Sequence, residues 1–179
     1  YRRAYHACFA PMDKYFTPFL VPHTKKGFTT KEINEILPEH NEGMCLVPQI
    51  LTNDAEGFVQ TVEKLKNYGY REVNLNLGCP SRTVASKFRG SGFLAKPEGL
   101  GRFLEEIFDR ADIDISIKTR IGRDEPEEFE RLLEIYNQYP LKELIIHPRV
   151  QQDYYNNCPN LAVFGAGLSE SRCPVCYNG

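Results

Sequence analysis

Short apolar runs alternate with stretches of helical periodicity along this chain, and the alternation predicts a parallel α/β fold. The clearest strand is Val73–Leu77, in which three aliphatic side chains alternate with two asparagines. The pattern predicts about seven strands in all, the other six at residues 6–12, 27–33 (a weak one), 45–51, 113–119, 144–147 and 174–177.

Apolar residues at three-and-four spacing predict helices between these strands. One helix begins at a cap on Asn53 or Asp54 and ends before Gly69, a residue typical of the end of a helix. The remaining helices are predicted from residue 97 onward, over residues 126–139 and over residues 161–169.

Chemically useful groups follow the carboxyl ends of the predicted strands. In a parallel barrel these ends lie on one face, which is where barrel enzymes hold their active sites. Taken singly, Gln49 suits a solvated position, Lys118 an extended surface side chain, and His147 a packing role. Their joint placement favours a site, which would comprise Pro11, Met12, Asp13, Gln49, Asn76, Cys79, Lys118, Arg120, His147, Arg149 and Asn178.

Cys79 is the leading candidate for chemistry. Gly78 and Pro80 end the strand and hold the thiol at the start of a loop, where it could act as a nucleophile or as a proton donor. The alternative is a buried cysteine that only packs. Cys173 and Cys176 have the spacing of a zinc knuckle or a dithiol redox pair, but no second pair accompanies them, so we predict a structural role and no metal.

Length and charge narrow the classes of protein. A chain of 179 residues suits one domain spanning residues 1–179 and is short for a complete eight-stranded barrel, which needs ~250 residues. The net charge of −2 implies no global attraction to nucleic acid, so such binding would need a local patch. No segment approaches the ~20 apolar residues of a membrane helix, and the six cysteines suit free thiols, so we expect a cytoplasmic protein without a membrane partner.

Several segments together resemble the tRNA-dihydrouridine synthases, a family of flavin-dependent TIM barrels. The central segment, Leu75–Ser81 followed by Val84 and Gly90, is the most specific. The others occur in the order typical of the family and are Ala10–Asp13, Pro48–Ile50, Ile117–Gly122, Ile146–Arg149 with Tyr154, and Tyr177–Gly179.

The resemblance implies a TIM (β/α)8-type barrel that reduces the C5=C6 bond of uridines in tRNA, using FMN and either NADPH or NADH. Cys79 would protonate C5 after hydride transfer to C6, while Lys118 and Arg120 would polarise the uracil or stabilise the anionic reduced flavin. FMN would be held by Pro11, Met12, Gln49, Lys118, His147 and Asn178. The target base would meet Asn76 and Arg120, and tRNA phosphates would contact Arg82, Lys87 and Arg89.

The sequence also departs from the family pattern. Lys14–Phe16 replaces a turn that usually contains glycine, and Pro148 follows His147 where glycine is more familiar. We expect an incomplete barrel, with the last strand, its phosphate site and a helical tRNA-binding domain absent, and therefore weak flavin binding and slow turnover. The full-length form would be a monomer. Alternatives are another FMN-dependent barrel, of the dihydroorotate dehydrogenase or ene-reductase type, and an inactive RNA-binding fragment.

Overall fold

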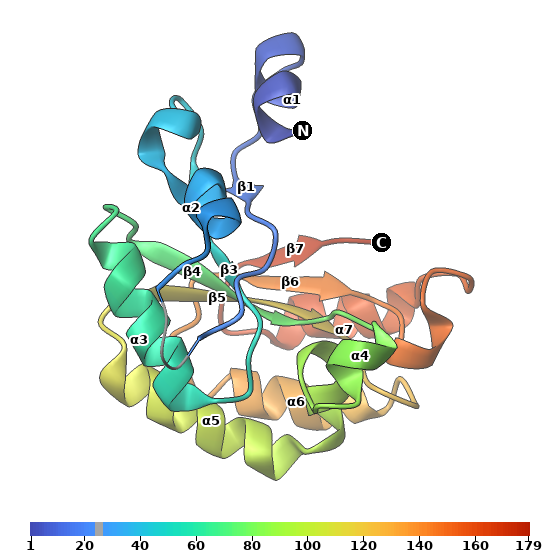
Figure 1. Cartoon of the computed structure of the whole chain (residues 1–179). Helices are drawn as coiled ribbons and strands as arrows, with labels where there is room; N and C mark the ends of the chain where they lie inside the picture. The colour runs from blue at the N-terminus through green and yellow to red at the C-terminus, as the bar shows by residue number, and fades with distance from the viewer. Residues whose placement is uncertain (24–26) are drawn as a thin grey trace.

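A computed structural model describes residues 1–23 and 27–179, and parallel strands form its centre (Figure 1). Five strands pair in the order β3-β4-β5-β6-β7, and two more form a small parallel sheet, β1-β2. The strands are β1 (Tyr15–Phe16), β2 (Leu46–Val47), β3 (Gln49–Ile50), β4 (Glu72–Leu77), β5 (Asp114–Arg120), β6 (Leu144–His147) and β7 (Val175–Tyr177).

Helices α3, α5 and α6 connect the parallel strands and lie along one side of the larger sheet, whereas α1 and α2 lie on the other side (Figure 1). The α-helices are α1 (Arg2–Cys8), α2 (Thr30–Ile36), α3 (Ala55–Lys66), α4 (Arg82–Ala85), α5 (Pro97–Arg110), α6 (Glu128–Tyr136) and α7 (Leu161–Glu170). The described residues also form 3-10 helices at Pro38–His40, Gly90–Ala95 and Gln151–Asp153. Within the described part of the chain, no helix has the length and apolar character needed to cross a membrane.

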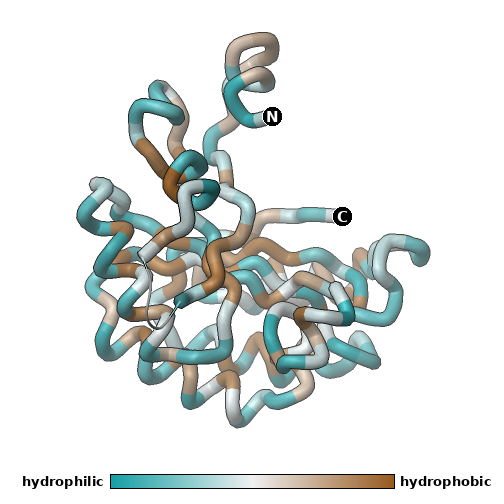
Figure 2. Tube along the Cα trace, in the orientation of Figure 1, coloured by the Kyte–Doolittle hydropathy of each residue, from teal (hydrophilic) through white to brown (hydrophobic). Residues whose placement is uncertain are grey.

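The two faces of the sheet differ in chemistry. Val73, Leu75 and Leu77 of β4 are fully buried in the core, together with apolar residues of α3 and α5. The intervening Asn74 and Asn76 belong to the opposite face, as the period of two in a strand requires. Figure 2 shows the resulting apolar centre within a mostly hydrophilic outer surface. The predicted alternation in this strand is confirmed.

Pro48 interrupts the strand predicted over residues 45–51. Proline has no N–H to donate to a strand ladder, and the segment divides there into β2 and β3. β2 pairs in parallel with β1, and β3 pairs in parallel with β4. A bridge between Leu20 and Ile50 extends the pairing of the β1 segment beyond Phe16. The two sheets are therefore neighbours along the chain, because β2 of the small sheet and β3 of the larger sheet flank Pro48 directly.

The strand predicted over residues 6–12 is wrong. Helix α1 covers residues 2–8, and aromatic side chains one turn apart contact one another along it: the Tyr5 ring stacks on that of Phe9 (centroids 5.0 Å apart) and lies tilted to that of Tyr1 (6.4 Å). Alanine and arginine also favour a helix over a strand here. The first strand instead begins at Tyr15, so Met12 precedes a strand rather than ending one.

The weak strand predicted over residues 27–33 is also wrong. Thr29 and Glu32 form a capping box, in which Thr29 Oγ1 accepts from the Glu32 N–H (3.3 Å) and Glu32 Oε2 accepts from the Thr29 N–H (2.8 Å). This reciprocal pair satisfies two N–H groups at the start of a helix and so selects α2.

The remaining predicted elements are confirmed, with small changes in their bounds. Strands β4 to β7 and helices α3, α5 and α7 lie where the hydrophobic pattern indicates. The helix predicted over residues 126–139 is shorter and spans Glu128–Tyr136. Asp54 precedes α3 as its cap residue, although its side chain makes no capping hydrogen bond.

Candidate active site

Two cavities that share several residues open at the carboxyl ends of the strands. The larger has a volume of about 690 Å³ and the smaller about 320 Å³, and Gly78, Lys118, Tyr155 and Asn178 line both. The larger is lined further by Met12, Lys14, Phe16, Phe19, Gln49, Asn76, Cys79, Pro80, Ile145, Cys176 and Tyr177. The smaller adds Arg120, His147, Arg149 and Gly179. Most candidate residues of the sequence analysis therefore meet in one region.

Pro11 is the exception among the predicted cofactor residues. It is exposed and lines neither cavity. Its neighbour Met12 lines the larger cavity, and the Met12 N–H donates to the hydroxyl of Tyr15 (3.0 Å).

Cys79 is fixed by its backbone on both sides. Its N–H donates to Asn76 Oδ1 at 3.0 Å, and its carbonyl accepts from the N–H of Ser91 at 3.1 Å. The Ser91 hydroxyl also donates to this carbonyl at 2.8 Å. The Cys79 side chain is half-buried at the wall of the larger cavity. Its thiol is therefore presented from a backbone that has little freedom to move.

Gly90 allows this close packing. It has a φ of +55°, a conformation that glycine adopts without the steric cost of a Cβ atom. A Cβ atom on Gly90 would lie 2.8 Å from the Cys79 carbonyl oxygen and 3.0 Å from the Cys79 Cβ. Gly90 thus allows the loop after α4 to pack against Cys79.

Lys118 carries a cationic group into both cavities. Burial lowers the pKa of its ammonium, the charge of Arg120 lowers it further, and Cys176 acts in the opposite direction. Among the residues that the structure describes, no carboxylate forms an ion pair with Lys118. An anionic group of a ligand would relieve the cost of burying this charge.

Arg120 has a different environment from the one expected of a residue that meets the target base. Its side chain is almost completely buried, with 1% of the residue exposed. The guanidinium donates to three backbone carbonyls, those of Gly78 (3.0 Å), Val150 (2.9 Å) and Tyr154 (2.7 Å). It therefore joins the loop after β4 to the loop after β6.

His147 lies buried at the end of β6. Its pKa is lowered to about 4, first by burial and then by the positive charges of Arg120, Lys118 and Arg149, while a hydrogen bond with the Asn178 backbone acts in the opposite direction. An Arg149 nitrogen lies 3.3 Å from His147 Nε2. Because arginine can only donate, Nε2 is the acceptor and the imidazole is neutral near pH 7. The site therefore contains an uncharged histidine among three cations.

The predicted phosphate-binding residues belong to one segment beside Cys79. Arg82 begins α4 and is exposed, as is Lys87. Arg89 is half-buried, and its Nε donates to Asn53 Oδ1 at 3.3 Å. Within the described residues none of these three side chains forms an ion pair, so their charges are available to a ligand.

Several wall residues lie outside the predicted site, and two of them, Tyr155 and Cys176, carry polar or reactive groups. Tyr155 lines both cavities, with the Arg120 guanidinium carbon 5.4 Å from its ring centroid and the His147 ring centroid 5.7 Å from it. Cys176 faces the larger cavity from β7, although the alternation along that strand could have indicated this. Across the described residues, no three histidine, cysteine or acidic side chains are grouped as a metal site would require.

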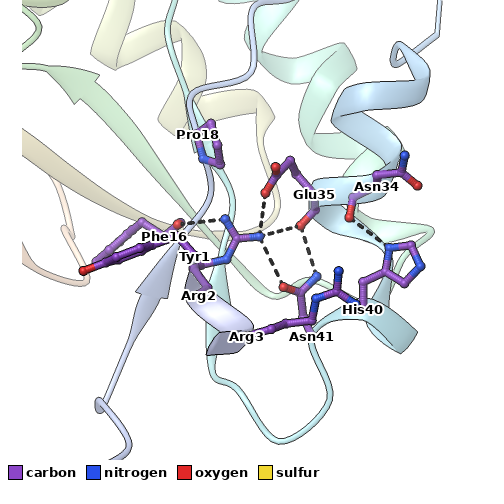
Figure 3. A pocket seen from close by; sticks show the side chains of 9 residues that line it. All are labelled: Tyr1, Arg2, Arg3, Phe16, Pro18, Asn34, Glu35, His40 and Asn41. Atoms are coloured by element: carbon purple, nitrogen blue, oxygen red, sulfur yellow. Dashed lines mark hydrogen bonds and ion pairs between the residues drawn. The ribbon is translucent and has the colours of Figure 1, made fainter. Parts of the chain in front are cut away.

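Another hollow, of about 610 Å³, is lined by residues of α1 and of the segment around α2 (Figure 3), and Phe16 lines both this hollow and the larger cavity. Arg2 crosses it and donates to Asn41 Oδ1 (3.2 Å) and to the carbonyls of Glu35 (3.0 Å) and Phe16 (3.4 Å). The Glu35 carboxylate forms an ion pair with the same guanidinium at 2.9 Å. This group of contacts fastens α1 to the segment around α2, and none of the predicted catalytic residues lies there.

The parallel strands, their helices on one side and the polar groups at the carboxyl ends define a class, the α/β proteins that form all or part of a TIM barrel. The sequence model described as dihydrouridine synthase (Dus) matches residues 11–179. The chain therefore belongs to the dihydrouridine synthase family.

Curated relatives carry matching names. The chain is 39% identical over 84 residues to a tRNA-dihydrouridine(20/20a) synthase of Shewanella oneidensis, an alignment that covers 45% of this chain and 25% of the relative. It is 29% identical over 108 residues to a probable tRNA-dihydrouridine synthase of Staphylococcus aureus, covering 60% and 33%. It is 24% identical over 152 residues to tRNA-dihydrouridine synthase B of Vibrio vulnificus, covering 84% and 47%. The chain thus spans half or less of these relatives.

Proposed function

We propose that the protein acts in the flavin-dependent reduction of uridine to dihydrouridine in tRNA, in the cytoplasm, with FMN as its cofactor and NADPH or NADH as the reductant. The observation that carries the proposal is the meeting of Cys79, Asn76, Gln49 and Lys118 around one cavity. Family membership and the names of the relatives support the same reaction.

The residues of the cavity fit a flavin. A flavin ring presents carbonyl and N–H groups along one edge, and the Gln49 amide offers both a donor and an acceptor to such an edge. Lys118 supplies a half-buried cation that has no carboxylate partner among the described residues, which suits a reduced flavin anion. We assign Met12, Gln49, Lys118, His147 and Asn178 to FMN. When bound, the reduced flavin supplies the hydride that adds to C6 of the uracil.

Cys79 supplies the proton in this proposal. The Cys79 thiol donates its proton to C5 of the uracil, from the side of the base that faces Cys79. The thiolate that remains then takes a proton from solvent. The backbone contacts of Cys79 to Asn76 and Ser91 hold the thiol in place during this transfer. Asn76 has one amide hydrogen beyond its internal bond to Gln49, and we assign it to a uracil carbonyl.

Arg120 acts indirectly in this proposal. Since its guanidinium is committed to three carbonyls, it contributes positive charge to the cavity and shapes the walls, and the base contacts fall to Asn76. The cationic segment Arg82, Lys87 and Arg89 binds phosphates of the tRNA that surround the extracted base.

The test begins with the flavin. The visible spectrum of the purified protein is recorded with added FMN, and NADPH is then added without oxygen. We expect a flavin spectrum that bleaches on reduction, followed by formation of dihydrouridine when unmodified tRNA is supplied. Folded protein that takes up no FMN at millimolar concentration, or that reduces FMN but never tRNA, would contradict the proposal.

Cys79→Ala separates catalysis from binding. We expect this variant to retain FMN binding and reduction by NADPH but to lose at least about 100-fold in the rate of tRNA reduction, the usual range for a general acid. Cys176→Ala is the matched control, because it removes a thiol from the same cavity that has no assigned step. Equal rates for both variants would show that Cys79 is not the proton donor.

A further inference from the structure

Buried polar side chains form a continuous hydrogen-bonded chain across β3, β4 and β5. Gln49, Asn74, Asn76 and Ser116 are each at most 9% exposed. The Asn76 amide donates to Gln49 Oε1 (2.7 Å), the Gln49 amide donates to Asn74 Oδ1 (2.8 Å), and the Asn74 amide donates to Ser116 Oγ (3.1 Å). The chain of bonds leads from the Cys79 loop into the interior of the sheet.

Backbone groups at the Cys79 loop fix the direction of this chain. The N–H groups of Gly78 and Cys79 can only donate, and both point at Asn76, which must present its oxygen to them (3.1 and 3.0 Å). Asn76 then presents its NH₂ to Gln49, so that Gln49 must accept there and donate to Asn74. Each amide therefore has one orientation that satisfies its neighbours.

Ser116 ends the chain. Its hydroxyl accepts from Asn74 and donates to the carbonyl of Val73 at 3.3 Å. A hydroxyl can both donate and accept, so it adapts to whichever group Asn74 presents. A flip of the Gln49 amide would therefore require Asn74 to turn as well, and Ser116 would then lose its bond to the Val73 carbonyl in order to donate to the Asn74 oxygen. Asn74 thus adds a second restraint on Gln49, from the interior, to the one that Asn76 supplies.

We propose that Asn74 is a positioning residue, which holds the Gln49 amide in one orientation and thereby sets the pattern of donor and acceptor that Gln49 offers to the ligand in the cavity. Gln49 lines the cavity, whereas Asn74 and Ser116 do not. The inference rests on the proposed function, in which Gln49 contacts the carbonyl and N–H groups of FMN. A flipped Gln49 amide would place its NH₂ against the N–H of FMN and its oxygen against the FMN carbonyl.

Three variants separate orientation from stability. Asn74→Asp keeps an acceptor facing Gln49, and its second oxygen can accept from the Ser116 hydroxyl. Asn74→Leu has a similar shape but removes the acceptor, so the buried Gln49 N–H loses its partner and the amide keeps only the restraint that Asn76 supplies. Ser116→Ala leaves an unpaired Asn74 N–H in the core, which also lowers stability, but preserves both bonds of Gln49.

The dissociation constant for FMN is measured by flavin fluorescence for all four proteins, together with the midpoint of thermal unfolding. We expect Asn74→Leu to raise the dissociation constant about tenfold or more, and Asn74→Asp and Ser116→Ala to change it less than about threefold. Asn74→Leu and Ser116→Ala should lower the midpoint by similar amounts. A rise in dissociation constant that merely follows the loss of stability, or an equal rise for Asn74→Asp, would overturn the proposal.

A second measurement needs no flavin. The side-chain N–H signal of Gln49 is assigned by NMR, and its exchange with water is followed in the wild-type protein and the three variants. Slow exchange is expected in all but Asn74→Leu. Fast exchange in the wild-type protein refutes the fixed amide even if FMN binds, whereas slow exchange without FMN binding supports it and refutes only the proposed function.

Discussion

Replacement of Gly90 by alanine tests whether close packing fixes Cys79. The new Cβ would lie 2.8 Å from the Cys79 carbonyl oxygen and 3.1 Å from Val84 Cγ1, at a φ of +55°. The left-handed conformation costs an alanine about 1–2 kcal/mol, and relief of overpacking adds about 1–3 kcal/mol. We therefore expect Gly90→Ala to lower the free energy of unfolding by about 2–5 kcal/mol.

Gly101→Ala is the matched control for this change. Gly101 lies within α5, and a Cβ there would have no atom within 4 Å. Alanine is the better helix former by about 1 kcal/mol, so this variant should be more stable than the wild type.

Urea unfolding supplies the free energies for both glycine variants, and the rate of alkylation of Cys79 by iodoacetamide, followed by peptide mass spectrometry, reports the position of its thiol. We expect the alkylation rate to change in Gly90→Ala and to stay constant in Gly101→Ala. If the free energies of unfolding of the two variants agree within about 0.5 kcal/mol, the close contact between Gly90 and Cys79 does not constrain the loop, and the reasoning is refuted.

Three further predictions concern other contacts. Arg120→Lys, which cannot reach three carbonyls with one ammonium, should lower the free energy of urea unfolding by about 3–5 kcal/mol, and a loss below 1 kcal/mol would refute the bridging role. For His147, the unfolded imidazole binds a proton below about pH 6.5 but the folded one only below about pH 4, so stability should fall as pH decreases through this window. His147→Gln should flatten that part of the stability curve, and an unchanged slope would contradict the lowered pKa. Thr29→Ala should lower the stability by about 1 kcal/mol through loss of the capping box, whereas Thr30→Ala, one residue later, should have little effect.

Strong periodicity accounts for the parts of the fold that the sequence predicts well. Val73–Leu77 alternates strictly, and α5 has apolar residues at helical spacing behind Pro97, so local pattern and burial agree. Where the prediction fails, another signal decides. The strand at Tyr15–Phe16 has only two ladder residues and depends on pairing with β2, which no local pattern reveals. The capping box of Thr29, in contrast, was present in the sequence.

The candidate site was predictable in position but not in its internal bonds. The rule that parallel strands present their carboxyl ends on one face correctly gathered Gln49, Asn76, Cys79, Lys118 and His147 around the cavities. The rule could not reveal that loop carbonyls surround the guanidinium of Arg120, because the conformation of those loops depends on tertiary contacts. The roles of these side chains toward FMN and tRNA stay predictions.

The contacts of Arg120 with two loops constrain how each can change in length. One rigid guanidinium meets the carbonyl of Gly78 after β4 and those of Val150 and Tyr154 after β6. An insertion or deletion between these acceptors and their strands would displace a carbonyl by several ångströms, beyond the reach of a planar group. Variation in loop length is therefore confined to the outer residues, past Pro80 on one side and past Tyr155 on the other.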